Sequence, residues 1–150
     1  MSEILLPGLS RLSEYLYLGD ANDVATPGRL ESVGITAICN LTETTDGLPR
    51  AWKDEDRYLR LNQGDGIAIS FEAITEFIAW MFVQRTHNRT VLIHCAAGVS
   101  RTSAFAILWL MFCGFSWDEA EAMVKAARPI ISPNPVLKES ILAFFAGATP

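Results

Sequence analysis

The segment TVLIHCAAGVSRTSAFAILWL, at residues 90–110, constrains the fold more than any other part of the sequence. Its first six residues form an apolar run of strand length, and from Ser100 or Arg101 onward an apolar run of helix length follows. The five residues between them, AAGVS, are small and include a glycine, which is typical of a tight loop. A strand that leads through a short loop into a helix is the repeating unit of α/β folds.

Strand and helix patterns alternate along the rest of the chain. Apolar or alternating runs predict strands within residues 11–20, 35–42 and 57–63, in addition to the strand at 90–95. Helical spacing and capping residues predict further helices at these places: residues 27–33, 71–87, 117–128 and roughly 136–146. The alternation predicts a single α/β domain over residues 1–150, with helices on both faces of its sheet.

Capping residues and helical spacing indicate where the helices lie. Thr26, Ser70 and Ser116 are N-cap candidates, and Glu119 completes a capping box with Ser116. Gly114 suits the left-handed conformation that ends many helices. The apolar residues that follow Ser70 fall at helical spacing, which predicts one buried helix face: Phe71, Ile74, Phe77, Ile78, Met81 and Phe82.

Composition and charge argue against several classes of protein. The chain has 150 residues, half of them apolar, which is typical of a compact domain and not of a disordered chain. Its net charge is −5 and it has no basic run, so we expect neither nucleic acid nor a membrane as its partner. The longest apolar run, 104–113, is too short to span a bilayer, and the first residues do not resemble a signal peptide. Three cysteines without paired spacing predict neither a disulfide framework nor a zinc site, and they favour a reducing cytoplasm. We expect no metal and no cofactor.

The loop between the strand and the helix has the composition of an anion site. Ligands of α/β sheets bind beyond the carboxyl ends of the strands, and Cys95 stands at such an end. Small side chains and Gly98 allow the loop amides to converge, and the following helix adds its positive N-terminal end. These groups favour a nucleophilic thiolate, and Arg101 adds a planar fork of donors that suits phosphate. The alternative is that Cys95 is a small buried hydrophobic residue at a strand end.

HCAAGVSRT resembles the signature of the cysteine-dependent protein phosphatases, in particular their small dual-specificity branch. The similarity covers almost the whole chain, because LSEYLYLGDAND, GITAICNLT and AARPIISPNPVLKESILAFF resemble other segments of that branch. The resemblance implies a protein tyrosine phosphatase-like fold, with a central, mostly parallel mixed sheet of about five strands. It also implies that a phosphate ester is attacked by Cys95 and that water hydrolyses the resulting phosphocysteine. The groups expected to bind the phosphate are Arg101 and the backbone amides of Ala96, Ala97, Gly98, Val99, Ser100 and Arg101.

A general acid is also required, because the leaving alkoxide or phenoxide needs a proton. Asp65, in NQGDGI, lies thirty residues before Cys95, where the family places its acid. The alternative is a simple turn, since aspartate beside glycine is common in turns. Asp54 and Asp56 are the next candidates, although a solvated charged face explains both. The sequence also departs from the family here, because Asn62 stands where proline is usual and glycines flank Asp65.

Supporting roles follow from the resemblance for three further residues. The Thr102 hydroxyl is expected to donate to the Cys95 sulfur, or else to bond locally within the helix. His94 is expected to order the loop, or else to be an ordinary buried strand residue. Asn40 is expected to brace the loop, with a strand-end turn as an equal alternative. The remaining cysteines, Cys39 and Cys113, are predicted to be buried, with Cys39 a weaker candidate for a redox partner of Cys95.

The expected substrate is a phosphorylated protein. The chain has no counterpart of the extra loop that deepens the cleft of the larger tyrosine-specific phosphatases, so phosphoserine and phosphothreonine are expected substrates beside phosphotyrosine. Phosphatases of this superfamily that act on phosphoinositides often carry lysine in the signature loop, whereas AAGVS has no basic residue. The alternatives are a phosphoinositide or RNA phosphatase, and a pseudophosphatase that binds phosphate without turnover. Oligomeric state is not indicated by the sequence.

Overall fold

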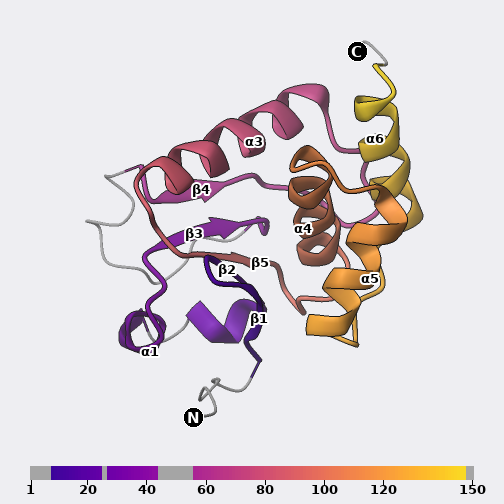
Figure 1. Ribbon diagram of the computed structural model, residues 1–150. Coiled ribbons are helices and arrows are strands. Elements are labelled where there is room, and N and C mark those ends of the chain that lie inside the picture. The colour runs from indigo at the N-terminus through magenta and orange to yellow at the C-terminus, as the bar shows by residue number, and fades with distance from the viewer. Residues whose placement is uncertain (1–7, 25–26, 44–55, 148–150) are drawn as a thin grey trace.

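A computed structural model of the protein describes residues 8–24, 27–43 and 56–147. In this part of the chain five strands form one sheet, with strand order β1-β2-β5-β3-β4 (Figure 1). The strands are β1 (Ser10–Ser13), β2 (Leu16–Gly19), β3 (Ala37–Asn40), β4 (Tyr58–Arg60) and β5 (Val91–His94). β1 pairs with β2 antiparallel, whereas β2–β5, β5–β3 and β3–β4 are all parallel. The expected mostly parallel mixed sheet is therefore confirmed.

Helices cover both faces of the sheet, as the alternation of elements predicted (Figure 1). The helical segments are η1 (Ala21–Val24), α1 (Pro27–Ser32), α3 (Phe71–Thr86), α4 (Arg101–Phe112), α5 (Trp117–Ala127) and α6 (Pro135–Phe145). Val91 and Ile93 of β5 belong to the large core cluster that also contains side chains of α3, α4, α5 and α6. Leu92 points to the opposite face and packs in a smaller cluster with Leu30 of α1 and Val24 of η1. Because both faces of β5 are buried, its sequence is continuously apolar and does not alternate.

Two strands are shorter than their apolar patterns predicted. Residues 35–42 contain only the four-residue β3, and residues 57–63 contain only the three-residue β4. The side chain of Asn40 accepts hydrogen bonds from the amide and the hydroxyl of Thr42, at 2.8 and 2.6 Å, and this local turn ends the strand. The apolar pattern continues because Leu41 and Leu61 remain buried beyond the strand ends.

Most predicted helix ends are confirmed by the caps. Ser70 accepts a hydrogen bond from the Ala73 amide, and both bonds of the capping box of Ser116 and Glu119 are present. Gly114 follows α4 with a φ of +114°, in the left-handed region. The predicted N-cap Thr26 lies outside the described residues.

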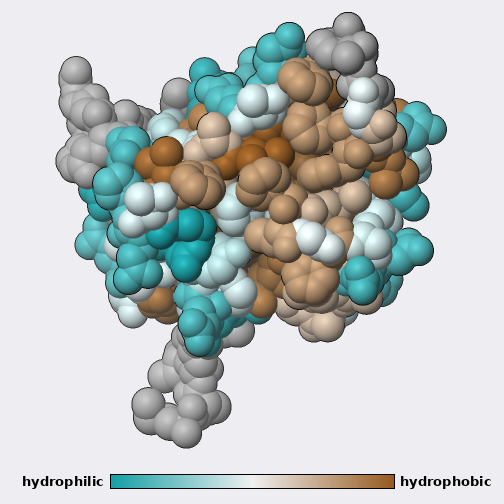
Figure 2. Space-filling model, turned by 45° about the horizontal axis from the view of Figure 1, so that its top comes forward, coloured by the Kyte–Doolittle hydropathy of each residue, from teal (hydrophilic) through white to brown (hydrophobic). Residues whose placement is uncertain are grey.

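The predicted buried face of α3 is only partly correct. Ile74, Phe77 and Met81 are buried, but Phe71 is 40% exposed and Phe82 is 61% exposed. A broad apolar area covers the face that bears α3, α4 and α6 (Figure 2). Among the described residues, no helix is both long and apolar enough to cross a bilayer.

Candidate active site

The carboxyl ends of neighbouring parallel strands meet at one edge of the sheet. His94, the last residue of β5, is in register with Gly19 at the end of β2 and with Asn40 at the end of β3. Asn40 is in turn in register with Arg60, which ends β4. The chain segments that follow these strands therefore gather at this edge, where α/β folds bind their ligands.

Cys95 follows β5 at this edge and is 2% exposed. Its Sγ accepts a hydrogen bond from Thr102 Oγ1 at 3.0 Å and another from the Gly98 amide at 3.3 Å. Thr102 is buried in the first turn of α4, and its hydroxyl also lies 3.5 Å from the carbonyl oxygen of Gly19. Two donors therefore converge on the sulfur at the N-terminal end of a twelve-residue helix, a location that stabilises negative charge.

Arg128 lies behind the loop that joins β5 to α4. Its buried side chain donates from Nε to the Gly98 carbonyl at 2.7 Å, and Nη2 lies 3.5 Å from the Ala97 carbonyl. Nη1 donates to the carbonyl of Gly8 and, at 2.9 Å, to the hydroxyl of Ser10 in β1. The N–H and C=O of a trans peptide point in opposite directions. Because Arg128 holds the carbonyls of Ala97 and Gly98 on its side of the loop, the N–H groups of the same peptides point to the opposite side. The bond from the Gly98 amide to the Cys95 sulfur is the visible result.

Backbone amides from other segments hold two more carbonyls of the loop. The Ala21 amide donates to the Ala96 carbonyl at 3.2 Å, and the Ser132 amide donates to the Val99 carbonyl at 3.0 Å. The loop is thus fixed from behind by segments distant in sequence. This arrangement orders its amides before any anion binds.

Gly98 is required by the close packing behind the loop. Its φ is +70°, and a Cβ at this position would lie 2.5 Å from the carbonyl oxygen of Gly19 at the end of β2. Any side chain would therefore force the loop away from the sheet.

Asp65 lies beside the loop, as the assignment of an acid requires. Its Oδ1 accepts a hydrogen bond of 2.7 Å from the hydroxyl of Ser100, whose Oγ in turn accepts one of 3.0 Å from the Asn134 amide. Arg101 joins the same two segments, because its Nη1 donates to the Gln63 carbonyl at 2.9 Å. The structure therefore brings the exposed Asp65, the half-buried Arg101 and the loop of Cys95 together at one edge of the sheet.

Of the two alternative acids, the structure describes only Asp56, which lies away from the loop of Cys95. Asp56 precedes β4, at the amino ends of the strands, and its carboxylate contacts Arg89 Nη1 at 2.5 Å and His87 Nε2 at 3.6 Å. The hydrogen bond from Arg89 lowers the pKa of the Asp56 carboxyl below its usual value. Asp54 lies outside the described residues.

The supporting residues differ in their surroundings. His94 and Asn40 are buried side by side in register, and Asn40 Nδ2 donates to the Tyr58 hydroxyl at 3.2 Å. Cys39 is fully buried in β3, as predicted. The prediction of burial for Cys113 is wrong: it is an exposed free thiol at the C-cap of α4, one residue before the turn at Gly114.

Arg128 and the side chain of Ser100 were missed in the sequence. A basic residue at a helix end is usually explained by the helix dipole, so nothing local distinguishes Arg128 from a solvated charge. The only signal was its position directly before Pro129, where the helix must end inside the domain. Ser100 appeared only as a source of a backbone amide, because its bond to Asp65 joins residues 35 positions apart.

Comparison with known proteins agrees with the fold and with the family that the sequence resembles. The family model described as "dual specificity phosphatase, catalytic domain" matches residues 16–146. The chain therefore belongs to the dual specificity phosphatase family, whose members are hydrolases, and the resemblance of HCAAGVSRT is confirmed. Mouse dual specificity protein phosphatase 15 is 29% identical over 139 residues, covering 91% of this chain and 57% of the relative. Human dual specificity protein phosphatase 14 is 33% identical over 139 residues, covering 89% of this chain and 67% of the relative.

Solved structures of the same family share the fold. The crystal structure of DUSP15 matches with a TM-score of 0.81 and 26% identity, over 95% of this chain and 90% of the other. The crystal structure of human DUSP28 matches with a TM-score of 0.79 and 23% identity, over 97% of this chain and 98% of the other. This chain spans little more than half the length of the mouse relative, so the likeness concerns the catalytic domain.

Proposed function

We propose that this chain is a dual-specificity protein phosphatase that hydrolyses phosphotyrosine, phosphoserine and phosphothreonine esters through a phosphocysteine intermediate. The observation that carries the proposal is the pair of hydrogen bonds that the Cys95 sulfur accepts from Thr102 and from the Gly98 amide. They place an ionisable sulfur at the centre of an ordered loop at a helix N-terminus, where negative charge is favoured.

In the first step the Cys95 thiolate attacks phosphorus, and the bond from phosphorus to the ester oxygen breaks. The Asp65 carboxylic acid donates its proton to that oxygen, so that a neutral alcohol or phenol leaves. Arg101 and the loop amides bind the equatorial oxygens of the phosphoryl group and stabilise their charge in the transition state. The bond between Ser100 and Asp65 supports this assignment, because it holds the acid beside the loop.

In the second step water attacks the phosphocysteine. The Asp65 carboxylate accepts a proton from the water, the sulfur–phosphorus bond breaks, and inorganic phosphate and the Cys95 thiolate form. The hydrogen bond from the Thr102 hydroxyl stabilises the sulfur as it regains its charge. His94 and Asn40 act as supports of the loop, because both lie at the strand ends on which it rests.

Phosphorylated proteins are the substrates that the chain's charge favours over phosphoinositides and RNA. The segment AAGVS carries no basic side chain, and the net charge of −5 opposes binding to polyanions. A protein substrate also fits the proposed cytoplasmic location. A pseudophosphatase that binds phosphate without turnover is the principal alternative, and the presence of Cys95, Arg101 and Asp65 argues against it.

The test is hydrolysis of para-nitrophenyl phosphate and of a phosphotyrosine peptide in EDTA by the wild type, Cys95→Ser and Asp65→Asn. We expect wild-type turnover, no turnover by Cys95→Ser, and a loss of about 10²- to 10⁴-fold for Asp65→Asn. The loss should be larger for the peptide, because nitrophenolate leaves without a proton more readily than a tyrosine phenolate. Wild-type protein that binds vanadate but hydrolyses neither compound would identify a phosphate-binding module instead. Peptides with phosphoserine and phosphothreonine then test dual specificity.

A further inference from the structure

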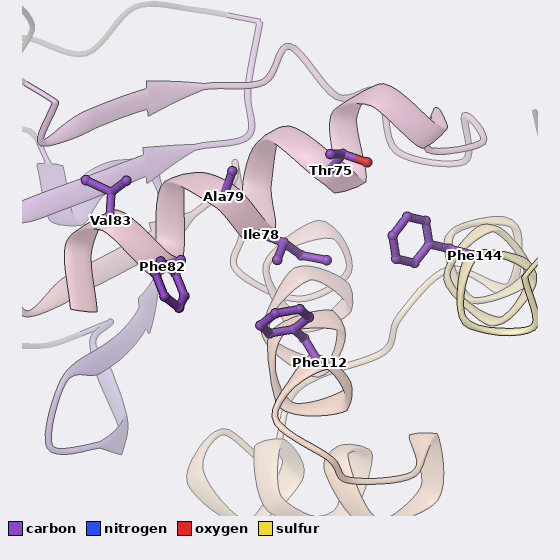
Figure 3. Close-up of a pocket in the computed structure, with 7 residues that line it drawn as sticks. All are labelled: Thr75, Ile78, Ala79, Phe82, Val83, Phe112 and Phe144. Atoms are coloured by element: carbon purple, nitrogen blue, oxygen red, sulfur yellow. The ribbon is translucent and has the colours of Figure 1, made fainter. Parts of the chain in front are cut away.

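An apolar groove lies between α3, α4 and α6, apart from the site at the strand ends (Figure 3). Its volume is about 490 Å³, and its walls are Thr75, Ile78, Ala79, Phe82, Val83, Phe112 and Phe144. In Figure 3, Phe112 of α4 and Phe144 of α6 face the α3 side chains across the open groove. The only polar side chain, Thr75, donates its hydroxyl to the Phe71 carbonyl at 2.9 Å. The groove therefore selects apolar side chains and offers no side-chain group for a polar ligand.

Exposure of this surface is unusual for a monomeric protein. Phe82 is 61% exposed and Phe112 is 47% exposed, and they lie on one continuous apolar surface (Figure 2). Contiguous exposed apolar surface of this kind marks interaction sites in soluble proteins. The groove is also within the size range of pockets that bind ligand side chains.

The charge next to the groove indicates the chemistry of its occupant. A second hollow shares Thr75 with the groove and is otherwise lined by Phe71, Glu72 and Glu76. Both glutamates are exposed, and among the described residues neither has an ion-pair partner within 4.0 Å. A ligand whose apolar side chains enter the groove and whose lysine or arginine side chains lie beside Glu72 and Glu76 would complement both the apolar walls and the negative charge.

The same charge opposes a second copy of this chain as the occupant. Each copy has a net charge of −5, and among the described residues no lysine or arginine lines the groove or the hollow beside it. A two-fold contact centred here would present the same patch from both copies. It would bring together four carboxylates without a basic partner from the lining residues.

Two further hollows lie between the groove and the segment that precedes Asp65. A third hollow, of about 390 Å³, contains Glu76 together with residues of the segment that carries the acid, among them Gln63 and Gly64. The third hollow shares Glu76 with the second, and the second shares Thr75 with the groove. The three hollows therefore follow one another along α3, from the Asp65 segment to the groove. From Ser70 to Phe82 the helix rises roughly 18 Å, which an extended peptide spans with about six residues.

We propose, on the basis of the proposed phosphatase function, that this groove docks a basic and apolar segment of the phosphoprotein substrate. The segment lies at least about six residues from the phosphorylated residue, because the helix alone spans roughly 18 Å between Ser70 and Phe82. Its apolar side chains enter between Phe82, Phe112 and Phe144, and its lysine or arginine side chains pair with Glu72 and Glu76. Docking at this distance raises the local concentration of the phosphorylated residue without altering the chemistry at Cys95.

The first experiment measures binding of a labelled, unphosphorylated peptide that carries two leucines and two lysines at helical spacing. The same peptide with glutamate in place of lysine is the control ligand. Phe82→Glu tests the groove because its side chain is exposed, and Met123→Glu, on the exposed face of α5, is the matched control variant. We expect Phe82→Glu to weaken binding of the lysine peptide at least about tenfold, as for loss of a hot-spot residue. Met123→Glu should bind as the wild type does.

The second experiment compares kcat/KM for a short phosphotyrosine peptide and for the same peptide extended to the lysine segment through spacers of six or more residues. Phe82→Glu should remove the advantage of the long peptide and leave para-nitrophenyl phosphate hydrolysis unchanged, whereas Glu72→Lys should reduce that advantage. Equal use of both peptides by the wild type, or equal binding of the glutamate peptide, would overturn the proposal. So would a wild-type dimer in sedimentation that Phe82→Glu dissociates. Groove binding without any turnover would contradict the phosphatase function and leave the peptide preference supported.

Discussion

At the scale of single residues, the buried guanidinium of Arg128 links stability to chemistry. It bonds the Gly98 carbonyl at 2.7 Å, and its charge polarises the peptide whose amide belongs to the next loop residue. A charged group that donates to a peptide carbonyl makes the N–H of the same peptide a stronger hydrogen-bond donor. Arg128 thus positions and strengthens the amides proposed to bind phosphate, although its hydrogen bonds go to Gly8, Ser10, Ala97 and Gly98 and not to the Cys95 sulfur.

Replacement of Arg128 by methionine should weaken phosphate binding because the loop carbonyls lose their charged donor. We expect vanadate affinity and kcat/KM to fall about 10- to 100-fold, within the range for loss of a buried charged hydrogen bond. Arg128→Lys should recover part of the loss, because one ammonium can still reach a carbonyl. The pH dependence of Cys95 alkylation by iodoacetate distinguishes an effect on the loop from an effect on stability alone. A purely structural role of Arg128 would lower the melting temperature without moving that profile.

Thr102 offers a different test, because its hydroxyl lies 3.0 Å from the sulfur and its proposed role is to stabilise the sulfur as it leaves. Thr102→Val should slow hydrolysis of the phosphocysteine more than its formation, so kcat for para-nitrophenyl phosphate should fall roughly tenfold for one lost charge-assisted bond. Rapid-quench experiments should then show a burst of nitrophenolate. Thr102→Ser retains the hydroxyl and should behave as the wild type. A fall in kcat without a burst would assign Thr102 to the first step.

At the scale of elements, local signals in the sequence located most helices and the strand β5. Ser70, Ser116 and Asn88 stand at or just beyond helix ends because capping and left-handed turns depend on neighbouring residues alone. The sequence could not show that Phe82 is exposed, because helical spacing defines a face but not what lies against it. The contacts of Arg128 and Ser100 were also beyond its reach, since they join segments brought together only by the tertiary fold.

The capping box of α5 allows a stability prediction at this scale. Ser116 accepts from the Glu119 amide at 3.1 Å, and Glu119 accepts from the Ser116 amide at 2.9 Å. Ser116→Ala removes the side-chain acceptor and should lower the free energy of unfolding by about 1 kcal/mol, measured by urea denaturation. Ser116→Asp, which keeps an acceptor at the N-cap, is the matched control and should change the free energy of unfolding little. Because α5 begins away from the strand ends, a large change in kcat for Ser116→Ala would contradict this structural role.

At the scale of the whole molecule, ionisation of buried carboxyl groups couples stability to pH. Asp23 of η1 is 5% exposed and accepts a hydrogen bond from the Asp20 amide at 2.7 Å. Burial raises its pKa to about 6. The hydrogen bond from the Asp20 amide opposes this rise, the Asp20 carboxylate adds to it, and the charge of Arg128 opposes it to a smaller extent. Between a pKa of 3.8 in the unfolded chain and about 6 in the folded one, the folded state holds more protons. The contribution of Asp23 to stability therefore decreases as pH rises through this range and stays low above pH 6.

Asp23→Asn should remove this dependence while retaining a side-chain oxygen as acceptor for the Asp20 amide. Between pH 4 and pH 7 the free energy of unfolding of the wild type should fall, relative to the variant, by on the order of 1 kcal/mol. Urea denaturation at several pH values measures the difference. Asp56→Asn is an informative control, because Arg89 lowers the pKa of Asp56 and its stabilising effect is lost as pH falls. The two variants should thus change the pH dependence in opposite directions, and parallel changes would contradict the raised pKa of the buried Asp23.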